Sequence, residues 1–187
     1  MNILEKASEL IYRKGYQATS IDEIIATTQV TKGAFFYHFK NKEEMGIAMV
    51  NDLMYPKLIP LMTKYLKQPG DIRARIYKMM KGILSNYEVF KVEFGCPVIN
   101  LVEEMASLNK AFYKALSRVI NTWREVLEIE ILKAQDLGEL SKDHNAGKIA
   151  LHIITNYGGA RNLGKVLGKS SYASFLGEFE KYLKQLA

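Results

Sequence analysis

The segment 32–40 combines basic, aromatic and small side chains at a spacing that suits contact with an anionic partner. The residues that share one helix face, at intervals of four, are Lys32, Gly33, Phe36, Tyr37 and Lys40. The apolar residues near the opposite face are Ala34, Phe35 and Phe39. Exposed aromatic rings beside ammonium groups fit a surface that is both apolar and anionic. A DNA groove is such a surface, because sugars and thymine methyl groups lie there beside phosphates.

Two short helices about a tight turn are needed to position these side chains. The first begins at Ser20, whose hydroxyl can accept from the N–H of Glu23 while the Glu23 carboxylate accepts from the Ser20 N–H. Its apolar stripe consists of Ile21, Ile24 and Ile25. The run 27–31 is rich in β-branched and hydroxyl side chains, so we expect the turn there, with Thr31 capping the second helix. The pattern predicts a helix-turn-helix reader of DNA.

Two further features favour a nearby anion. Gly33 costs up to about 1 kcal/mol of helix propensity relative to Ala, but its missing side chain lets a helix N-terminus approach phosphates or base edges. A third helix is expected from Asn41, with Glu44 at its third position. Lys42 then lies at the positive end of the helix dipole, which is unfavourable for a cation unless an anion binds there.

The segment 3–45, ILEKASELIYRKGYQATSIDEIIATTQVTKGAFFYHFKNKEEM, resembles the N-terminal domain of TetR-family transcriptional regulators along its whole length. The motifs that carry the resemblance are the first helix ending at Gly15, the helix start at Thr19 and Ser20, and the segments 30–33, 35–39 and 40–44. The resemblance implies base or groove contacts from Thr31, Lys32, Gly33 and Phe36. It implies phosphate contacts from Ser20, Tyr37, His38 and Lys42. A histidine at a helix end can also be purely structural, so both interpretations of His38 remain open.

Two features depart from the family pattern. Only Met1 and Asn2 precede the first expected helix, where family members commonly carry a basic stretch, so contacts from such an arm are not expected unless the native chain starts earlier. Residues 1–50 hold six basic and six acidic side chains, a net charge of zero. Segment 31–42, however, contains three lysines and no acid, so local charge must supply the electrostatic part of DNA binding.

Composition limits the fold class and the compartment. A chain of 187 residues with 48% apolar side chains can bury a substantial core. The net charge of +6 suits a nucleic-acid partner, but the excess lies in residues 51–187. One cysteine excludes an intramolecular disulfide and a cysteine-built zinc site, and it fits a reducing compartment. Because no signal peptide or membrane-length apolar run occurs, we expect a cytoplasmic protein without a membrane partner.

Beyond residue 45 the helical pattern continues and no convincing alternation indicates a strand, so the sequence predicts an all-α fold. Prolines and glycines near 56, 60, 69–70, 95–97, 138 and 164–168 separate the elements. The expected helices are 42–54, a broken stretch near 57–67, 71–90, 97–106, 108–135, 143–163 and 171–186. We expect a helix-turn-helix domain at 1–45 and a helical ligand-binding and dimerisation domain at 46–187.

The last two expected helices carry apolar stripes that another surface must cover. The residues that we expect in a homodimer interface are Ile153, Tyr157, Gly158, Phe175, Phe179 and Tyr182. The family resemblance implies a four-helix bundle between two copies, and a helix-turn-helix gains affinity by reading two half-sites. The alternative is that the two helices cover each other within one chain.

The segment 71–135 is rich in aromatic and methionine side chains, which in isolation indicate a plain core. The resemblance implies instead an effector pocket, with GCPVINLVEEMA at 95–106 and AQDLGEL at 134–140 similar to one branch of the family. The expected ligand-binding residues are Met80, Tyr87, Phe94, Cys96, Asn100, Trp123, His152 and Asn156. Cys96 precedes an expected helix start at Pro97, where the dipole favours thiolate, so it is either a reactive sensor or a small buried side chain. Solvated faces or satisfied core groups explain Glu103, Glu104, His152 and Asn156 as well as a role as polar pocket groups does.

These observations favour a dimeric, ligand-responsive repressor that binds a palindromic operator of double-stranded DNA and is released by an apolar or amphipathic small molecule. We expect no enzyme activity, metal or cofactor, because the sequence has no Gly-rich phosphate loop, paired-histidine metal motif or nucleophile elbow. Two alternatives remain: an enzyme that uses Cys96 and His152, and an all-α protein-interaction module that ignores DNA. Neither the operator nor the effector follows from the sequence.

Overall fold

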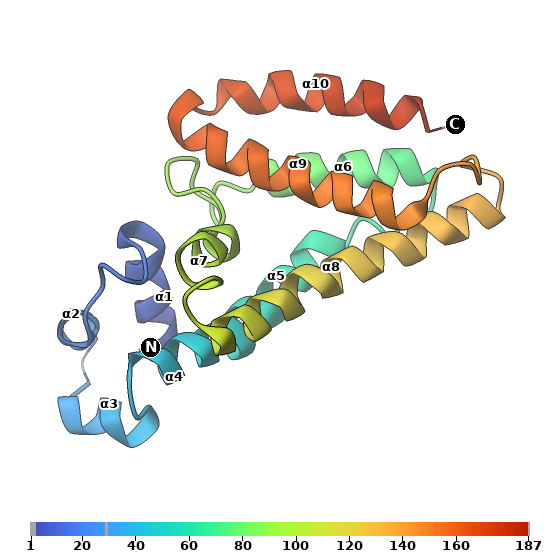
Figure 1. Cartoon of the computed structure of the whole chain (residues 1–187). Helices are drawn as coiled ribbons and strands as arrows, with labels where there is room; N and C mark the ends of the chain where they lie inside the picture. Colours follow the sequence, from blue (N-terminus) through green and yellow to red (C-terminus); the bar gives the residue numbers. More distant parts are fainter. Residues whose placement is uncertain (1–2, 29, 187) are drawn as a thin grey trace. The chain divides into compact units, whose positions relative to one another are not determined.

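The segments with helical apolar spacing form helices (Figure 1). A computed structural model describes residues 3–28 and 30–186, and all regular secondary structure within these ranges is helical. The all-α prediction is therefore confirmed. Met1, Asn2, Gln29 and Ala187 lie outside the described residues, so the expectation about an N-terminal arm and the middle of the 27–31 turn do too.

The helices group into two compact units. The first unit comprises residues 1–58 and 97–119, and the second comprises 59–96 and 120–187. These bounds differ from the two domains expected from the sequence, which stay a prediction. The difference arises because α7 (Pro97–Met105) and the start of α8 (Lys110–Asp136) pack with the N-terminal helices.

The first unit is built on short helices whose apolar sides meet. Its N-terminal helices are α1 (Ile3–Lys14), α2 (Ile21–Thr27), α3 (Lys32–His38) and α4 (Lys42–Ala48). The helices α1 and α2 contact each other, as do α2 and α3. Fully buried side chains at the centre of this unit include Ile24, Phe35, Met45 and Phe112. Helices of seven residues are too short to be stable alone, so this shared core and the end caps must hold them.

A π-helical segment, η1 (Met49–Met54), joins α4 to α5 (Tyr55–Thr63) without interruption. The Tyr55 N–H donates to the carbonyl of Val50, five residues earlier. The predicted break at Pro56 is therefore wrong. A proline removes one helix donor and crowds the preceding turn, and the wide π turn ahead of Pro56 accommodates it. Pro60 also lies inside α5.

The second unit packs α10 (Ser170–Lys184) against α6 (Ile72–Leu84) and α9 (Ala146–Leu167). The predicted helix 71–90 is too long, because α6 ends at Leu84 and single-turn hydrogen bonds follow it. The predicted helix 143–163 is too short at its C-terminal end. The helix continues past Gly164 and stops at Gly168, whose φ of 76° favours glycine. Among the described residues, no helix has the length and apolar character that crossing a bilayer requires.

Candidate nucleic-acid interface

The capping pattern predicted for the three short helices is present. The Ser20 hydroxyl accepts from the Glu23 N–H at 3.2 Å, and the Glu23 carboxylate accepts from the Ser20 N–H at 2.8 Å. The Thr31 hydroxyl caps α3 by accepting from the Ala34 N–H at 3.2 Å. Each such cap stabilises a helix by about 1 kcal/mol. Local side chains thus fix where each helix of the reader begins.

The helix α3 exposes the side that the sequence assigns to DNA. Phe35 is fully buried, whereas Phe36 is 43% and Tyr37 86% exposed. The other predicted contact residues exposed around this helix are Ser20, Thr31, Lys32, Gly33 and His38. An exposed tyrosine and phenylalanine beside a lysine need a partner that is apolar and anionic, which a DNA groove supplies.

Lys32 lies on the exposed side and contacts an acid of the neighbouring helix. Its ammonium is 3.1 Å from the Asp22 carboxylate, but the two side chains are 65% and 76% exposed. Exposed pairs of this kind contribute at most about 1 kcal/mol. A phosphate or a guanine edge can therefore compete for Lys32.

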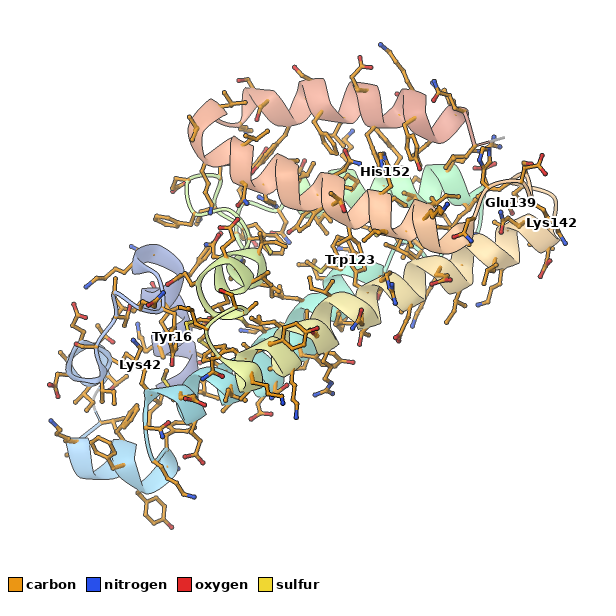
Figure 2. The ribbon with its side chains drawn as sticks, in the orientation of Figure 1. Tyr16, Lys42, Trp123, Glu139, Lys142 and His152 are labelled. Atoms are coloured by element: carbon orange, nitrogen blue, oxygen red, sulfur yellow. The ribbon has the colours of Figure 1, made fainter. Side chains whose placement is uncertain are left out.

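Lys42 is held differently, against the turn between α1 and α2 (Figure 2). Its ammonium lies 4.4 Å from the centre of the Tyr16 ring and donates to the Gln17 carbonyl at 3.4 Å. Burial lowers the pKa of Lys42 from its ordinary value, while the charges of Glu104 and Glu23 act in the opposite direction. The cation is thus fixed at the first position of α4 and partly desolvated, which strengthens its attraction to an incoming phosphate.

Glu104 on α7 anchors the same turn, a role that sequence reasoning missed. Its carboxylate accepts from the backbone N–H groups of Tyr16 at 3.1 Å and Gln17 at 3.0 Å. Gly15 has a φ of 92°, and a Cβ there would lie 3.2 Å from both Glu104 oxygens. The contact joins residues 88 positions apart, so no local pattern could reveal it. The only sequence signal is a glycine at the end of the first helix.

Aromatic packing also supports the turn between α1 and α2. Tyr16 is buried and meets Phe112 of α8 edge to face at 4.8 Å. Burial, with the charge of Glu43, raises the pKa of Tyr16 to about 12. At Gly46 a Cβ would come within 2.5 Å of Phe112 and 2.7 Å of Tyr16. The first unit therefore holds Lys42, Tyr16, Glu104 and Phe112 in one run of contacts.

The structure separates the expected ligand-binding residues into different places. In the second unit Met80, Cys96 and Trp123 are buried, and Trp123 packs edge to face on Tyr157 at 5.2 Å. His152 and Asn156 instead line a groove on the outer side of α9 and α10, where His152 lies 4.4 Å from the Tyr182 ring. The structure therefore does not bring His152 and Asn156 together with Trp123, and their role in ligand binding stays a prediction. Three other expected residues are half-buried: Tyr87 and Phe94 after α6, and Asn100 on α7 in the first unit.

The expected dimer residues also differ in how far they are buried within one chain. Ile153 and Tyr157 are fully buried and Phe179 is 3% exposed within one chain. Tyr157 packs on Trp123 of α8, and α10, which carries Phe179, packs against α6 and α9. These three residues cannot contact a second copy unless the fold opens. Gly158, Phe175 and Tyr182 are half-buried and remain accessible at the edge.

The described residues contain no group of three or more His, Cys, Asp or Glu side chains placed to hold a metal ion. Cys96 is buried, with a 1% exposed side chain. The arrangement that stands out chemically is therefore the cationic and aromatic side of α3 with Lys42 behind it.

Comparisons with known proteins agree with this geometry. Residues 3–49 match "Bacterial regulatory proteins, tetR family" and residues 73–176 match "Tetracyclin repressor-like, C-terminal domain". An HTH-type transcriptional regulator of Lactococcus lactis, from the lacX 3' region, is 34% identical over 64% of this chain. The match spans 61% of that relative's length. The transcriptional regulator AcuR of Cereibacter sphaeroides is 29% identical over 85% of this chain and 73% of its own.

The fold is also found in solved structures. A TetR transcriptional regulator from Chloroflexus aurantiacus superposes with a TM-score of 0.88 at 25% identity, covering 99% of this chain and 95% of its own. Both ends of the present chain match domains of one family, and the matched N-terminal residues include the capped helices and the exposed side of α3. The chain therefore belongs to the tetR family of bacterial regulatory proteins, a family of ligand-responsive, DNA-binding transcriptional regulators.

Proposed function

We propose that this chain is a repressor that binds a pseudo-palindromic operator as a homodimer and leaves it when a small effector binds the second unit. The observation that carries the DNA-binding part is the exposed side of α3, where Tyr37 is 86% and Phe36 43% exposed beside Lys32. In this assignment Thr31, Lys32, Gly33 and Phe36 contact bases or the groove. The residues assigned to phosphates are Ser20, Tyr37, His38 and Lys42.

The dimer part is supported by the groove on the outer side of α9 and α10. Its lining residues are His152, Thr155, Asn156, Gly159, Ala160, Leu163, Leu167, Ser171, Tyr172 and Phe175. Leu163 and Leu167 are 62% and 60% exposed, and a Cβ added at Gly159 would meet nothing within 4 Å. A second copy can present the same apolar strip in a two-fold arrangement and cover both. Gly158, Phe175 and Tyr182 lie at the edge of this proposed interface.

The repressor assignment is supported by the match of residues 73–176 to a tetracyclin repressor-like C-terminal domain. Release by an effector requires that the effector prefers the conformation that does not bind DNA, since equal affinity for both conformations shifts nothing. The buried aromatic cluster around Trp123 is where we place that effector.

Selection of bound sequences from a random duplex pool tests the proposal. The full chain should recover two inverted half-sites whose centres lie about 34–36 Å apart, or a multiple of it. A reporter gene placed behind the recovered site should then be expressed more strongly when the regulator is removed. A tight dimer that retains no preferred sequence would favour the protein-interaction module instead. Turnover of a small molecule without duplex binding would favour the enzyme.

A further inference from the structure

Arg161 is a fully buried cation at the centre of the second unit. Its guanidinium lies 4.7 Å from the centre of the Phe90 ring, 5.4 Å from that of Tyr172 and 5.7 Å from that of Tyr157. One terminal nitrogen donates to the Ile83 carbonyl, and the other donates to the Tyr172 hydroxyl at 3.3 Å. Among the described residues, no carboxylate forms a salt bridge with it.

Partial charges are all that compensate this cation. Ile83 lies in the last turn of α6, where unpaired carbonyls and the helix dipole favour a positive charge. Ring faces add a further attraction. A buried ion without a full counter-charge is nevertheless costly, because its hydration is lost. The site therefore carries one positive charge that no carboxylate of the described residues balances through a salt bridge.

Buried hydrogen-bond donors without an acceptor among the described residues lie on Arg161 and on the side chains packed beside it. The Arg161 Nε, the Tyr157 hydroxyl and the Trp123 Nε1 are all buried and make no well-aligned hydrogen bond to a described residue. Burial, and next the neighbouring Cys96, raise the pKa of Tyr157 well above its ordinary value, so this hydroxyl keeps its proton and can donate. Trp123 packs on Tyr157 at 5.2 Å, and Tyr157 lies beside Arg161. Orphaned buried donors of this kind are rare in proteins and call for an acceptor.

We propose that Arg161, Tyr157 and Trp123 recognise the carboxylate of a small organic acid that carries an apolar or aromatic portion. The oxygens of a carboxylate can accept from several donors at once, and its charge matches that of the planar guanidinium. Phe90, Tyr157 and Tyr172 surround the cation with apolar ring surface, which suits the remainder of such a ligand. The inference rests on the proposed function, because it names the chemical class of the effector.

The covering element is the segment 85–96, which carries Phe90 over the guanidinium. Its backbone bonds are single turns, such as Phe90 N–H to Asn86 carbonyl at 2.8 Å and Gly95 N–H to Lys91 carbonyl at 3.0 Å. A segment built from separate turns opens at lower cost than a helix, because few hydrogen bonds must break together. It is thus the part of this unit that makes room for the ligand.

Trp123 is the only tryptophan of the chain, so its fluorescence reports on this site. The full chain should be titrated with benzoate, propionate and octanoate, and with benzamide, propionamide and octanamide as neutral counterparts. At least one acid should change the emission saturably and bind at least about tenfold more tightly than its amide, since a charged hydrogen bond is lost in the amide. Sodium sulfate at equal ionic strength should leave the emission unchanged.

Three variants make the test specific. Tyr157→Phe should lower the affinity for the acid by about fivefold or more. Its melting temperature should stay equal or rise, because an unsatisfied buried hydroxyl is removed. Arg161→Lys should lower the affinity further, because lysine keeps the charge but loses the fork of donors. Tyr113→Phe, at an exposed position of α8, is the matched control and should bind like the wild type.

The proposal is overturned if no acid binds, if acids and amides bind equally, if sulfate reproduces the response, or if Tyr157→Phe binds the acid like wild type. Operator binding by the wild-type chain without any acid is measured separately. If the chain binds its operator but only a neutral molecule releases it, the proposed function stands and a carboxylate effector is excluded. If the wild-type chain binds no duplex at all, the proposed function itself is contradicted.

Discussion

Glu104 accepts a hydrogen bond from the backbone N–H of Tyr16, 88 residues earlier in the chain, at 3.1 Å. The ammonium of Lys42 in turn lies over the Tyr16 ring, 4.4 Å from its centre. Both residues are labelled in Figure 2. A carboxylate on α7 thus positions the turn on which a proposed phosphate contact depends.

Glu104→Ala should lower the free energy of unfolding by about 1–3 kcal/mol, because two backbone donors lose a charged acceptor. It should also weaken the operator complex, since Lys42 loses its support. Glu104→Gln keeps one acceptor oxygen and should fall between wild type and Glu104→Ala. Urea unfolding and operator titration give the two quantities. Glu93→Gln, at an exposed position of the second unit, is the control for removing a charge. Operator affinity that is unchanged in Glu104→Ala would separate the anchor from DNA binding.

Lys42→Ala should weaken specific and random duplexes by similar factors, because phosphates carry no sequence information. The slope of log affinity against log salt should fall by about one for each phosphate contact that is lost. Titrations at several salt concentrations measure both effects. Lys142→Ala, on the loop before α9, removes an exposed lysine and should leave the slope at its wild-type value. A loss confined to the specific sequence would move Lys42 from phosphate contact to base readout.

Lys32→Ala should act on sequence preference instead. We expect the discrimination at one or two base pairs to fall by about 1–3 kcal/mol, while affinity for random DNA changes little. Binding to a set of operators with single base-pair changes measures this profile. The Asp22 partner of Lys32 is exposed, so the fold should tolerate the change. A preference profile identical to wild type would exclude Lys32 from base contact.

The capping box gives a pH dependence with a defined sign. Hydrogen bonds from the Lys14 side chain, and then from Ser20, lower the pKa of Glu23 from 4.5 to about 2. The folded-state pKa is below the unfolded one, so the ionised form stabilises the native state above the ordinary value. This contribution is lost as the pH falls from about 4.5 towards 2. Urea unfolding across this window should therefore show a smaller loss for Glu23→Gln than for wild type. Parallel curves for the two proteins would contradict the prediction.

Leu163→Glu should convert the proposed dimer into monomers, because it places a charge in the groove of α9 and α10. Val166→Glu is the matched control: Val166 is 86% exposed on the same helix and does not line that groove. Sedimentation of both variants distinguishes them. Phe179→Glu, which the sequence suggests as a dimer variant, should unfold the second unit instead, because Phe179 lies in the core. Equal dimerisation of the Leu163 and Val166 variants would place the interface elsewhere.

The sequence predicts well whatever depends on neighbours along the chain. The caps at Ser20, Thr31 and Asn41 each need one side chain and one N–H three residues on, so their residue types suffice. Amphipathic spacing likewise predicts which stretches are helical. It does not say which neighbour covers a stripe, so the pattern predicts Ile153, Tyr157 and Phe179 at a dimer interface although all three are buried within one chain. The contacts of Glu104 and Arg161 join distant segments, and no local pattern encodes them.

The composition of the first unit also limits how its DNA-binding helices can be transferred to another protein. A fragment cut at residue 49 would contain every proposed DNA-contacting side chain, yet it would lack both Glu104 and Phe112. The α1–α2 turn would lose its carboxylate anchor, and Tyr16 would lose its aromatic neighbour. A chimera that grafts this reader onto another regulator must therefore take α7 and the start of α8 along with it. The portable module is discontinuous in the chain, even though its contacts to DNA are not.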